Sequence, residues 1–408
     1  MTASATDITY RYERWRAVSA GMIETAATTF LLLIAVRWFH ADAWAKAVVA
    51  AAGSVGLLLS PLAVAYVARR GWPVAKGASR LSMMGAAAFL VMAAVPFLPV
   101  YAVGSVVALA AASSALPFIT QIYHENYHER ERGSRFSRTM MIRIGVAAAF
   151  SEFAGRVLSV HIDYFRLLLL MFAAAFAVSA YCFSKIPSQP LETSSGSHPL
   201  RSLKYVKEDR MFRLTLVAWM LMGTGNLVMY PLRVEYLANP KYHLALEIST
   251  IALLVGVIPN MARLIMSPIW GWLFDRMNFF ALRIVLNLGF MLGILSFFTS
   301  DSLYGLMLGS VIFGIANAGG DVAWSLWVTK FAPPERVADY MAVHTFFTGI
   351  RGVAAPVLAF HLVTSLGMVT MGWICAVLIA LSMVVLAREL RFGKKARPAT
   401  PLAEEVSE

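Results

Sequence analysis

The sequence has little charge and little cysteine. Only 14% of its 408 residues are Asp, Glu, Lys or Arg, whereas 59% are hydrophobic, and the mean hydropathy is +0.66. Soluble domains rarely carry so little charge, so this composition predicts an integral membrane protein. The two cysteines, Cys182 and Cys375, lie in apolar stretches, which argues against a disulfide framework. The sequence also lacks a P-loop motif, so we expect no ATP-driven step and no bound cofactor.

Long apolar stretches recur along the whole chain. Inside a bilayer the backbone must satisfy its own hydrogen bonds, so each stretch is expected to form a helix. The predicted fold class is therefore an all-α membrane protein with about twelve transmembrane helices in two six-helix bundles. The predicted spans are 17–36, 47–68, 78–98, 101–123, 136–160, 164–184, 211–233, 246–273, 282–299, 303–330, 338–362 and 366–387.

The basic residues follow the predicted topology. Lys and Arg outnumber Asp and Glu by 35 to 23, which gives a net charge of +12. When both termini are placed in the cytoplasm, most basic residues outside the spans fall on the cytoplasmic side. The charge thus predicts a protein of the cytoplasmic (inner) membrane with cytoplasmic termini, and it does not indicate nucleic-acid binding. The first apolar stretch is too long for a signal-peptide core, so we interpret it as a retained span.

The two halves of the chain carry similar loops. "SPLAVAYVARRG" at 60–71 aligns with "SPIWGWLFDRMN" at 267–278, and "YHERERGSRF" aligns with "FAPPERVADY" 204 residues later. A nearly constant offset at equivalent loops indicates parallel six-helix repeats. The predicted domains are an N-terminal bundle (1–187), a cytoplasmic linker (188–210), a C-terminal bundle (211–387) and a basic, disordered cytoplasmic tail (388–408).

One short motif points to a different chemistry. His124, Glu125 and His128 fit H-E-x-x-H, the pattern in which two histidines on one helix face bind zinc and the glutamate activates water. The aligned loop of the second half carries no metal ligand, and no third ligand is evident nearby. We therefore interpret the motif as part of the repeated loop and expect no metal, while a zinc-dependent membrane hydrolase remains an alternative.

The loop after the eighth predicted span resembles the cytoplasmic gate motif of the major facilitator superfamily. Gly271, Asp275 and Arg276 match the motif, and in the first half Arg69 and Gly71 match it. Span count, central linker and the Glu-Arg segment after the tenth span extend the resemblance over the whole chain. The resemblance implies two rocking bundles around a central site, with this loop helping to hold the cytoplasmic gate closed.

Several ionisable residues lie inside predicted spans, where each needs a partner or an aqueous cavity. Glu152 and Arg156 are four residues apart, and their spacing predicts a structural ion pair. Polar residues Gln121, Asn226 and Asn317 fall on helices that line the central cavity in the family. The candidates for the substrate and proton pathway are Glu24, Gln121, Arg143, Asn226, Arg263, Asn317, Asp321 and Arg351.

These observations predict a non-enzymatic, monomeric secondary transporter that moves a small solute by alternating access. Glu24 or Asp321 is expected to exchange a proton during transport, because both acids lie on cavity-lining helices. The pathway candidates include three arginines but only two acids, and this excess of one positive charge favours an anionic solute. A transport-inactive sensor or scaffold of the same fold is a further alternative. The solute, the direction of transport and the coupling mode stay open.

Overall fold

The structure is a computed structural model that describes residues 4–190, 203–330 and 337–390. The described residues form helices and no sheet, and eleven helices are long and apolar enough to cross a membrane. The predicted disorder of the tail and most of the predicted linker lie outside the described residues. The all-helical membrane fold predicted from the sequence is confirmed.

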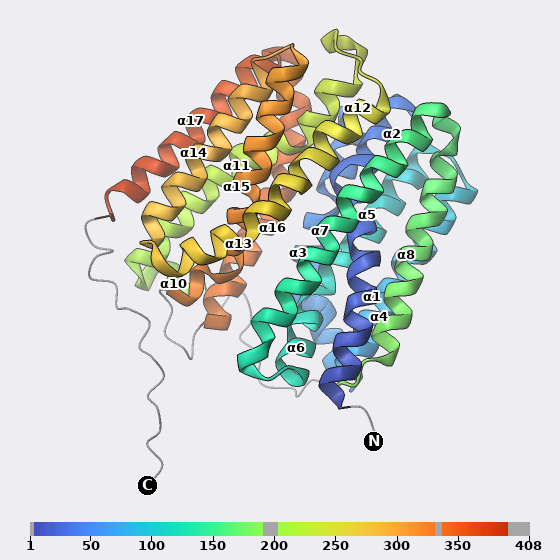
Figure 1. The fold of residues 1–408 in the computed structure, drawn as a ribbon, viewed down its shortest axis with the longest axis vertical. Coiled ribbons are helices and arrows are strands. Elements are labelled where there is room, and N and C mark those ends of the chain that lie inside the picture. Colours follow the sequence, from blue (N-terminus) through green and yellow to red (C-terminus); the bar gives the residue numbers. More distant parts are fainter. Residues whose placement is uncertain (1–3, 191–202, 331–336, 391–408) are drawn as a thin grey trace.

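The N-terminal half consists of six spans (Figure 1). A π-helical turn at Ala26–Phe30 joins α1 to α2, and α5 and α6 form one span that is interrupted at Ala115, two residues before Pro117. Proline in the first turn of α6 costs no hydrogen bond, because that N–H would be unpaired there. The helices are α1 Ala5–Thr25, α2 Leu31–Arg37, α3 Ala43–Arg69, α4 Val74–Ala94, α5 Leu98–Ser114, α6 Leu116–Asn126, α7 Glu129–Val160 and α8 Phe165–Lys185.

The C-terminal half repeats this arrangement. A second π-helical turn, Leu253–Val257, joins α12 to α13, and a short 3₁₀ turn, Trp327–Lys330, follows α15. The helices are α10 Lys204–Glu208, α11 Arg210–Ala238, α12 Ile248–Ala252, α13 Ile258–Arg276, α14 Phe279–Phe298, α15 Leu303–Leu326, α16 Val337–Leu366 and α17 Met368–Ala387.

Helix α7 is the span that apolarity alone does not identify. It is 32 residues long but carries Arg143, Glu152 and Arg156, so it is not among the eleven apolar spans. It packs against α1 in its own half and against α12 and α13 in the other half. With α7 the layout is twelve membrane helices in two bundles of six, as the sequence predicts.

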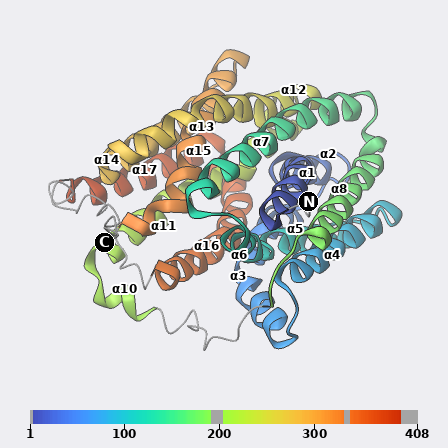
Figure 2. The ribbon, with the colours of Figure 1, turned by 60° about the horizontal axis from the view of Figure 1, so that its bottom comes forward.

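The two halves meet along two helix pairs. Figure 2 shows α7 beside α12 and α13 at one edge of the interface and α3 beside α16 at the other. Small residues allow close approach: a Cβ on Gly352 would overlap Ser54 of α3, and one on Gly256 would overlap Ser151 of α7. The backbone at these glycines therefore packs directly against side chains of the other half.

Of the two ends of the molecule, only one shows polar contacts between the halves among the described residues. Lys46 Nζ lies 2.7 Å from Glu235 Oε1, Arg37 Nη2 donates to the Leu246 carbonyl at 2.6 Å, and Ser249 N donates to Ser159 Oγ at 2.7 Å. Within the described ranges, no hydrogen bond joins the halves at the opposite end, where α1 begins and α17 ends. Figure 1 shows the helices of the two halves diverging toward that end. The end that contains residues 37–46 and 235–249 is called the closed end below.

Candidate functional site

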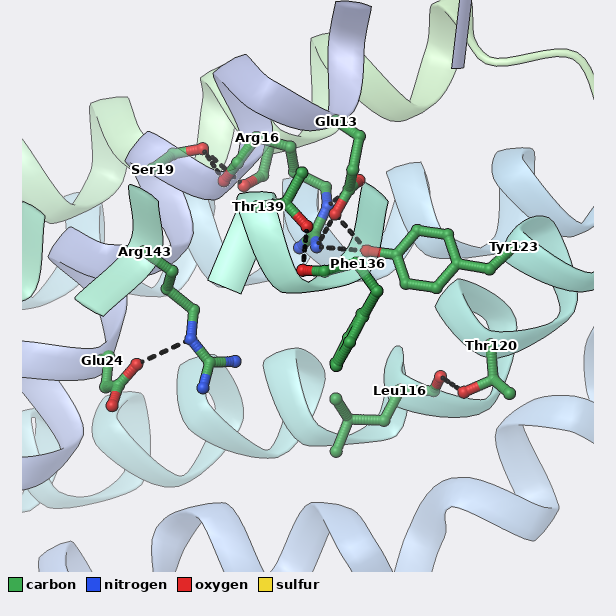
Figure 3. Close-up of polar contacts among 11 residues, drawn as sticks. Glu13, Arg16, Ser19, Glu24, Leu116, Thr120, Tyr123, Phe136, Thr139 and Arg143 are labelled. Carbon is green, nitrogen blue, oxygen red and sulfur yellow. Dashed lines mark hydrogen bonds and ion pairs between the residues drawn. The ribbon is translucent and has the colours of Figure 1, made fainter. Parts of the chain in front are cut away.

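Four charged side chains from four helices meet between the two halves. Arg263 of α13 lies at the centre: its Nη1 is 2.5 Å from Glu24 Oε1 of α1, and its Nε is 2.6 Å from Asp321 Oδ2 of α15. Glu24 Oε2 also forms an ion pair with Arg143 Nε of α7 at 2.9 Å (Figure 3). These four residues, Arg143, Glu24, Arg263 and Asp321, are called the central network.

The central network is only partly buried. Arg263 is 5% exposed, whereas the side chains of Asp321 and Arg143 keep 35% and 30% of their surface accessible. All four lie within their helices and not in connecting loops. A charged group in this position can exchange protons with water and still interact strongly with its partners, because the surroundings have a low effective dielectric.

The helices place these groups through two local features. The π-helical turn in the first span begins two residues after Glu24, and the one between α12 and α13 ends six residues before Arg263. Such turns insert one extra residue and are frequent at functional sites. Ser267 Oγ donates to the Arg263 carbonyl at 2.6 Å, so a side chain one turn on satisfies that backbone group.

A small cavity lies next to the central network, toward the closed end. Its volume is about 50 Å³, enough for a few water molecules. Thr28, one helical turn after Glu24, lines it together with Ser54 of α3 and Tyr230 of α11. Both halves contribute to its walls, so the cavity spans the interface on which the halves would move.

The other four pathway candidates lie on α6, α11, α15 and α16. Gln121 donates from Nε2 to Glu125 Oε1 at 2.8 Å near the end of α6, and Asn317 is half-buried one turn before Asp321. The Asn226 Oδ1 atom is buried without a hydrogen-bond partner among the described residues. Arg351 is buried inside the C-terminal half, where its Nη1 donates to the Trp219 carbonyl at 2.5 Å. The network therefore gathers four of the eight candidates.

The gate motif is exposed and disengaged in this structure. Asp275 and Arg276 are both exposed, and the Arg276 guanidinium lies 4.3 Å from the Trp272 ring centroid. A Cβ on Gly271 would meet nothing within 4 Å. In the first half, Arg69 is exposed and Gly71 has a φ of +60°, a backbone conformation that favours glycine. The motif lies at the end of the molecule opposite the closed end.

The two remaining motifs have simple surroundings. Glu152 and Arg156 form an exposed ion pair at 2.6 Å on α7. In the H-E-x-x-H segment, Glu125 accepts hydrogen bonds from Gln121 and from the backbone N–H of Gln189. Within the described part of the chain, no three His, Cys, Asp or Glu residues are grouped as metal ligands would be. The zinc alternative is not favoured.

One buried cluster in the N-terminal half was not predicted from the sequence. Arg16 forms an ion pair with Glu13 at 2.5 Å, and the Tyr123 hydroxyl of α6 donates to Glu13 (Figure 3). Glu13 is 1% exposed. The predicted first span begins at residue 17, whereas α1 begins at Ala5, so both residues were assigned to the loop. The pattern of Glu13 three residues before Arg16 was the available signal.

The C-terminal half contains a second cluster that was missed. Arg283 was predicted at the edge of a span but is 2% exposed inside the bundle, where it contacts Trp219. His344 packs against Trp219 and Trp324, and neither of its ring nitrogens has a hydrogen-bond partner among the described residues.

Comparison with known proteins gives a consistent result. The sequence model of the Major Facilitator Superfamily matches residues 237–406. The nucleoside transporter NupG has a similar structure, with a TM-score of 0.71 at 14% identity over 96% of this chain and all of that chain (100%). The xylose transporter XylE from E. coli gives 0.63 at 16% identity, covering 95% and 96%. A POT family transporter in complex with a thioalcohol-conjugated peptide gives 0.67 at 15% identity, covering 95% and 96%. No curated protein sequence matches the chain.

The family match covers residues 237–406, less than half of the chain, and the solved transporters share the fold over nearly the whole chain at 14–16% identity. The eleven long apolar helices among the described residues indicate an integral membrane protein.

Proposed function

We propose that the protein is a proton-coupled secondary transporter for a small solute that carries one anionic group. The central network carries this proposal, because it joins the two halves in the middle of the membrane through the pair between Arg263 and Glu24. A charge pair across the moving interface links the chemistry of its groups to the relative position of the halves. Protonation or solute binding at this pair therefore acts directly on the conformational equilibrium.

The charges of the central network support coupling between a proton and an anion. Two guanidinium groups, Arg143 and Arg263, face two carboxylates, Glu24 and Asp321, so the network as it stands is balanced. The sequence-based count had one arginine more than acids because it included Arg351, which lies inside the C-terminal half and outside the network. Protonation of one carboxylate leaves one uncompensated guanidinium, and guanidinium binds carboxylate or phosphate groups in a bidentate manner. A proton and a monoanionic solute would thus bind together with no net change in charge.

The polar contacts at the closed end support alternating access. Lys46–Glu235 and Arg37–Leu246 join the halves there, while Asp275 and Arg276 at the other end are exposed. In the opposite state the closed-end contacts would separate, and the end of α13 at residues 271–276 would dock against its neighbours. The Arg263–Glu24 pair would then loosen, which releases Glu24 for protonation.

The orientation proposed from the basic residues completes this picture. When the protein lies in the inner membrane with both termini in the cytoplasm, the closed end faces away from the cytoplasm. The central network is then accessible from the cytoplasm. The domain boundaries proposed from the sequence, 1–187 and 211–387, divide the chain in the segment between α8 and α11. We place the protein among transporters and not enzymes, acting as a monomer.

The test is solute-driven proton movement in proteoliposomes loaded with a pH-sensitive dye. A panel of monocarboxylates and their neutral amides is applied to the purified full-length protein. At least one monocarboxylate is expected to change the luminal pH, whereas its amide does not. Glu24→Gln or Asp321→Asn is expected to keep solute exchange but to lose the pH change, because the proton-binding group is gone.

The exposed acid Glu152 offers a matched control, since Glu152→Gln removes a carboxylate from α7, the helix that carries Arg143, without changing a residue of the network. It is expected to behave like the wild type. Full proton coupling in both network variants would reject these two acids as proton carriers. Solute binding without flux would favour the sensor alternative, and equal transport of acids and amides would reject the anionic solute.

A further inference from the structure

A group of basic side chains lies inside the C-terminal half, away from the central network. The Arg283 guanidinium of α14 is 3.7 Å from the Trp219 ring centroid, and the His344 ring of α16 is 5.2 Å from it. Arg351, two turns after His344, donates to the Trp219 carbonyl. Arg283 lies within Coulombic range of Arg351, and His344 lies within range of both. Arg283, His344 and Arg351 around Trp219 are called the basic cluster.

The basic cluster is deeply buried and contains no acid. Arg283 is 2%, His344 1% and Arg351 7% exposed. Among the residues described, neither arginine forms an ion pair with any carboxylate, in contrast to Arg263. Two like charges therefore face each other in the interior of a membrane-embedded bundle, where burial of an unpaired charge costs several kcal/mol.

Several hydrogen-bonding atoms of the cluster have no partner within the described ranges. They are Arg283 Nη1, Arg351 Nε, both ring nitrogens of His344, Trp219 Nε1 and Thr348 Oγ1. Thr348 lies one turn after His344 on the same face of α16. The guanidinium and indole N–H groups, one imidazole N–H group and the hydroxyl group can each donate a hydrogen bond. Buried donors without acceptors are rare in folded proteins.

The surrounding contacts hold the cluster in place. Arg283 Nη2 donates to Asn287 Oδ1 at 3.2 Å, Asn287 donates to Ser382 Oγ at 3.1 Å, and Ser382 donates to the Ala218 carbonyl at 2.8 Å. A Cβ on Gly223 would overlap the Arg351 guanidinium, so the glycine leaves the room that this side chain occupies. The donors are therefore fixed before any ligand arrives, which lowers the entropic cost of binding.

We propose that the basic cluster binds a small inorganic anion that neutralises Arg283 and Arg351 inside the C-terminal half. An anion at this position accepts the unpaired donors and removes the repulsion between the two guanidinium groups. The site does not depend on the proposed transport function. Its arginines are separate from Arg143 and Arg263, and α14 and α17, which supply Asn287 and Ser382, pack within their own half. The anion is a structural ligand, so its binding stabilises the folded protein.

The first test measures thermal unfolding of the purified full-length protein in detergent. Sodium gluconate is replaced stepwise by sodium chloride, bromide or sulfate at constant ionic strength. The wild type is expected to show a saturable rise of several degrees in melting temperature with at least one of these anions. Arg283→Met, which removes one guanidinium but keeps an apolar chain of similar length, is expected to lose this rise.

Arg276→Met is the matched control, because Arg276 also stacks on a tryptophan in the same half but is exposed. It is expected to keep the full rise. The opposite result would overturn the proposal: a wild type with the same melting temperature in all anions, together with an Arg283→Met variant that is more stable. Such a result means that the guanidinium is buried without a counterion.

A second measurement reports binding directly and covers the case in which Arg283→Met does not fold. Anomalous scattering from crystals grown in bromide is expected to show one bromide beside Trp219 and His344. His344→Phe keeps both arginines and an aromatic ring but removes one donor. It is expected to raise the anion concentration that gives half of the rise in melting temperature at least tenfold. Bromide absent from the cluster, with an unchanged anion response in His344→Phe, would reject the site.

Discussion

The two halves of the protein treat buried arginine differently. In the N-terminal half, Arg16 is paired with Glu13 and Arg143 with Glu24, so each guanidinium has a carboxylate from its own half. In the C-terminal half, Arg263 has Asp321, but Arg283 and Arg351 have no acid among the described residues. The halves share a fold and a repeat, yet only one of them neutralises all of these charges with its own side chains.

This difference separates fixed charge pairs from charges that need a ligand. A buried base beside an acid is stable by itself, and it loses that stability when the acid is removed. A buried base surrounded by unpaired donors is stable only when something else supplies the negative charge. The same residue type therefore has a structural role in one half and, on our proposal, a binding role in the other.

The largest expected effect comes from breaking the buried Glu13–Arg16 ion pair of the N-terminal half. Glu13→Gln leaves the Arg16 guanidinium buried without a counterion, and we expect the free energy of unfolding to fall by about 3–5 kcal/mol. Chemical denaturation in detergent micelles measures this. Arg16→Met combined with Glu13→Gln is expected to recover most of the loss, because the unpaired charge is then gone. A Glu13→Gln variant as stable as the wild type would show that Arg16 needs no acid, and the comparison between the halves would fail.

A smaller effect is expected at the closed end, where the acid of one half is neutralised by the base of the other. Lys46→Met leaves Glu235, which is 2% exposed, with Asn239 Nδ2 at 2.7 Å as its remaining partner. We expect the equilibrium to shift about tenfold, or about 1.4 kcal/mol, toward the state that is open at this end. Labelling of a Thr28→Cys probe by a membrane-impermeant thiol reagent measures the shift. The native cysteines are buried and give little background.

Lys76→Met is the control for this shift, because Lys76 lies at the other end of the molecule and stacks on Trp72. It is expected to leave the labelling rate unchanged. Equal labelling in the Lys46 and Lys76 variants would mean that the Lys46–Glu235 pair does not contribute to closure.

The smallest effect is expected for the exposed pair on α7. Glu152→Gln removes a pair whose members are 39% and 77% exposed, so solvent screens most of its attraction. The free energy of unfolding is expected to change by no more than about 0.5 kcal/mol. A loss as large as that of Glu13→Gln would show that burial does not determine how much each ion pair contributes to stability.

Much of the fold follows from the sequence for a simple physical reason. A bilayer leaves an apolar stretch no alternative to helix, so most spans could be predicted from length and apolarity, while the two-bundle layout was predicted from the repeated loops. Helix ends were less predictable, because the first turns of α1 are polar and α14 begins at Phe279, three residues before the predicted span. Residues 13 and 16 therefore fell outside the predicted spans, and residue 283 fell at the edge of one.

The central network could be predicted only in part. The sequence identifies Glu24, Arg143, Arg263 and Asp321 as charges that need partners, because each interrupts an apolar stretch. It does not say which acid meets which base, since those contacts depend on how the halves pack. The arginine excess expected in the central site is a clear example. Arg351 lies on the predicted helix but contacts the Trp219 carbonyl inside its own half.

The two π-helical turns have a consequence for motion. Each contains one residue more than an α-helical turn, and they lie in adjacent spans from different halves, in contact with each other. When such a surplus residue moves along the helix, each residue that it passes rotates by roughly 100° and shifts by about 1.5 Å. Movement of the surplus residue past Glu24 or past Arg263 would therefore turn that side chain without unfolding the helix.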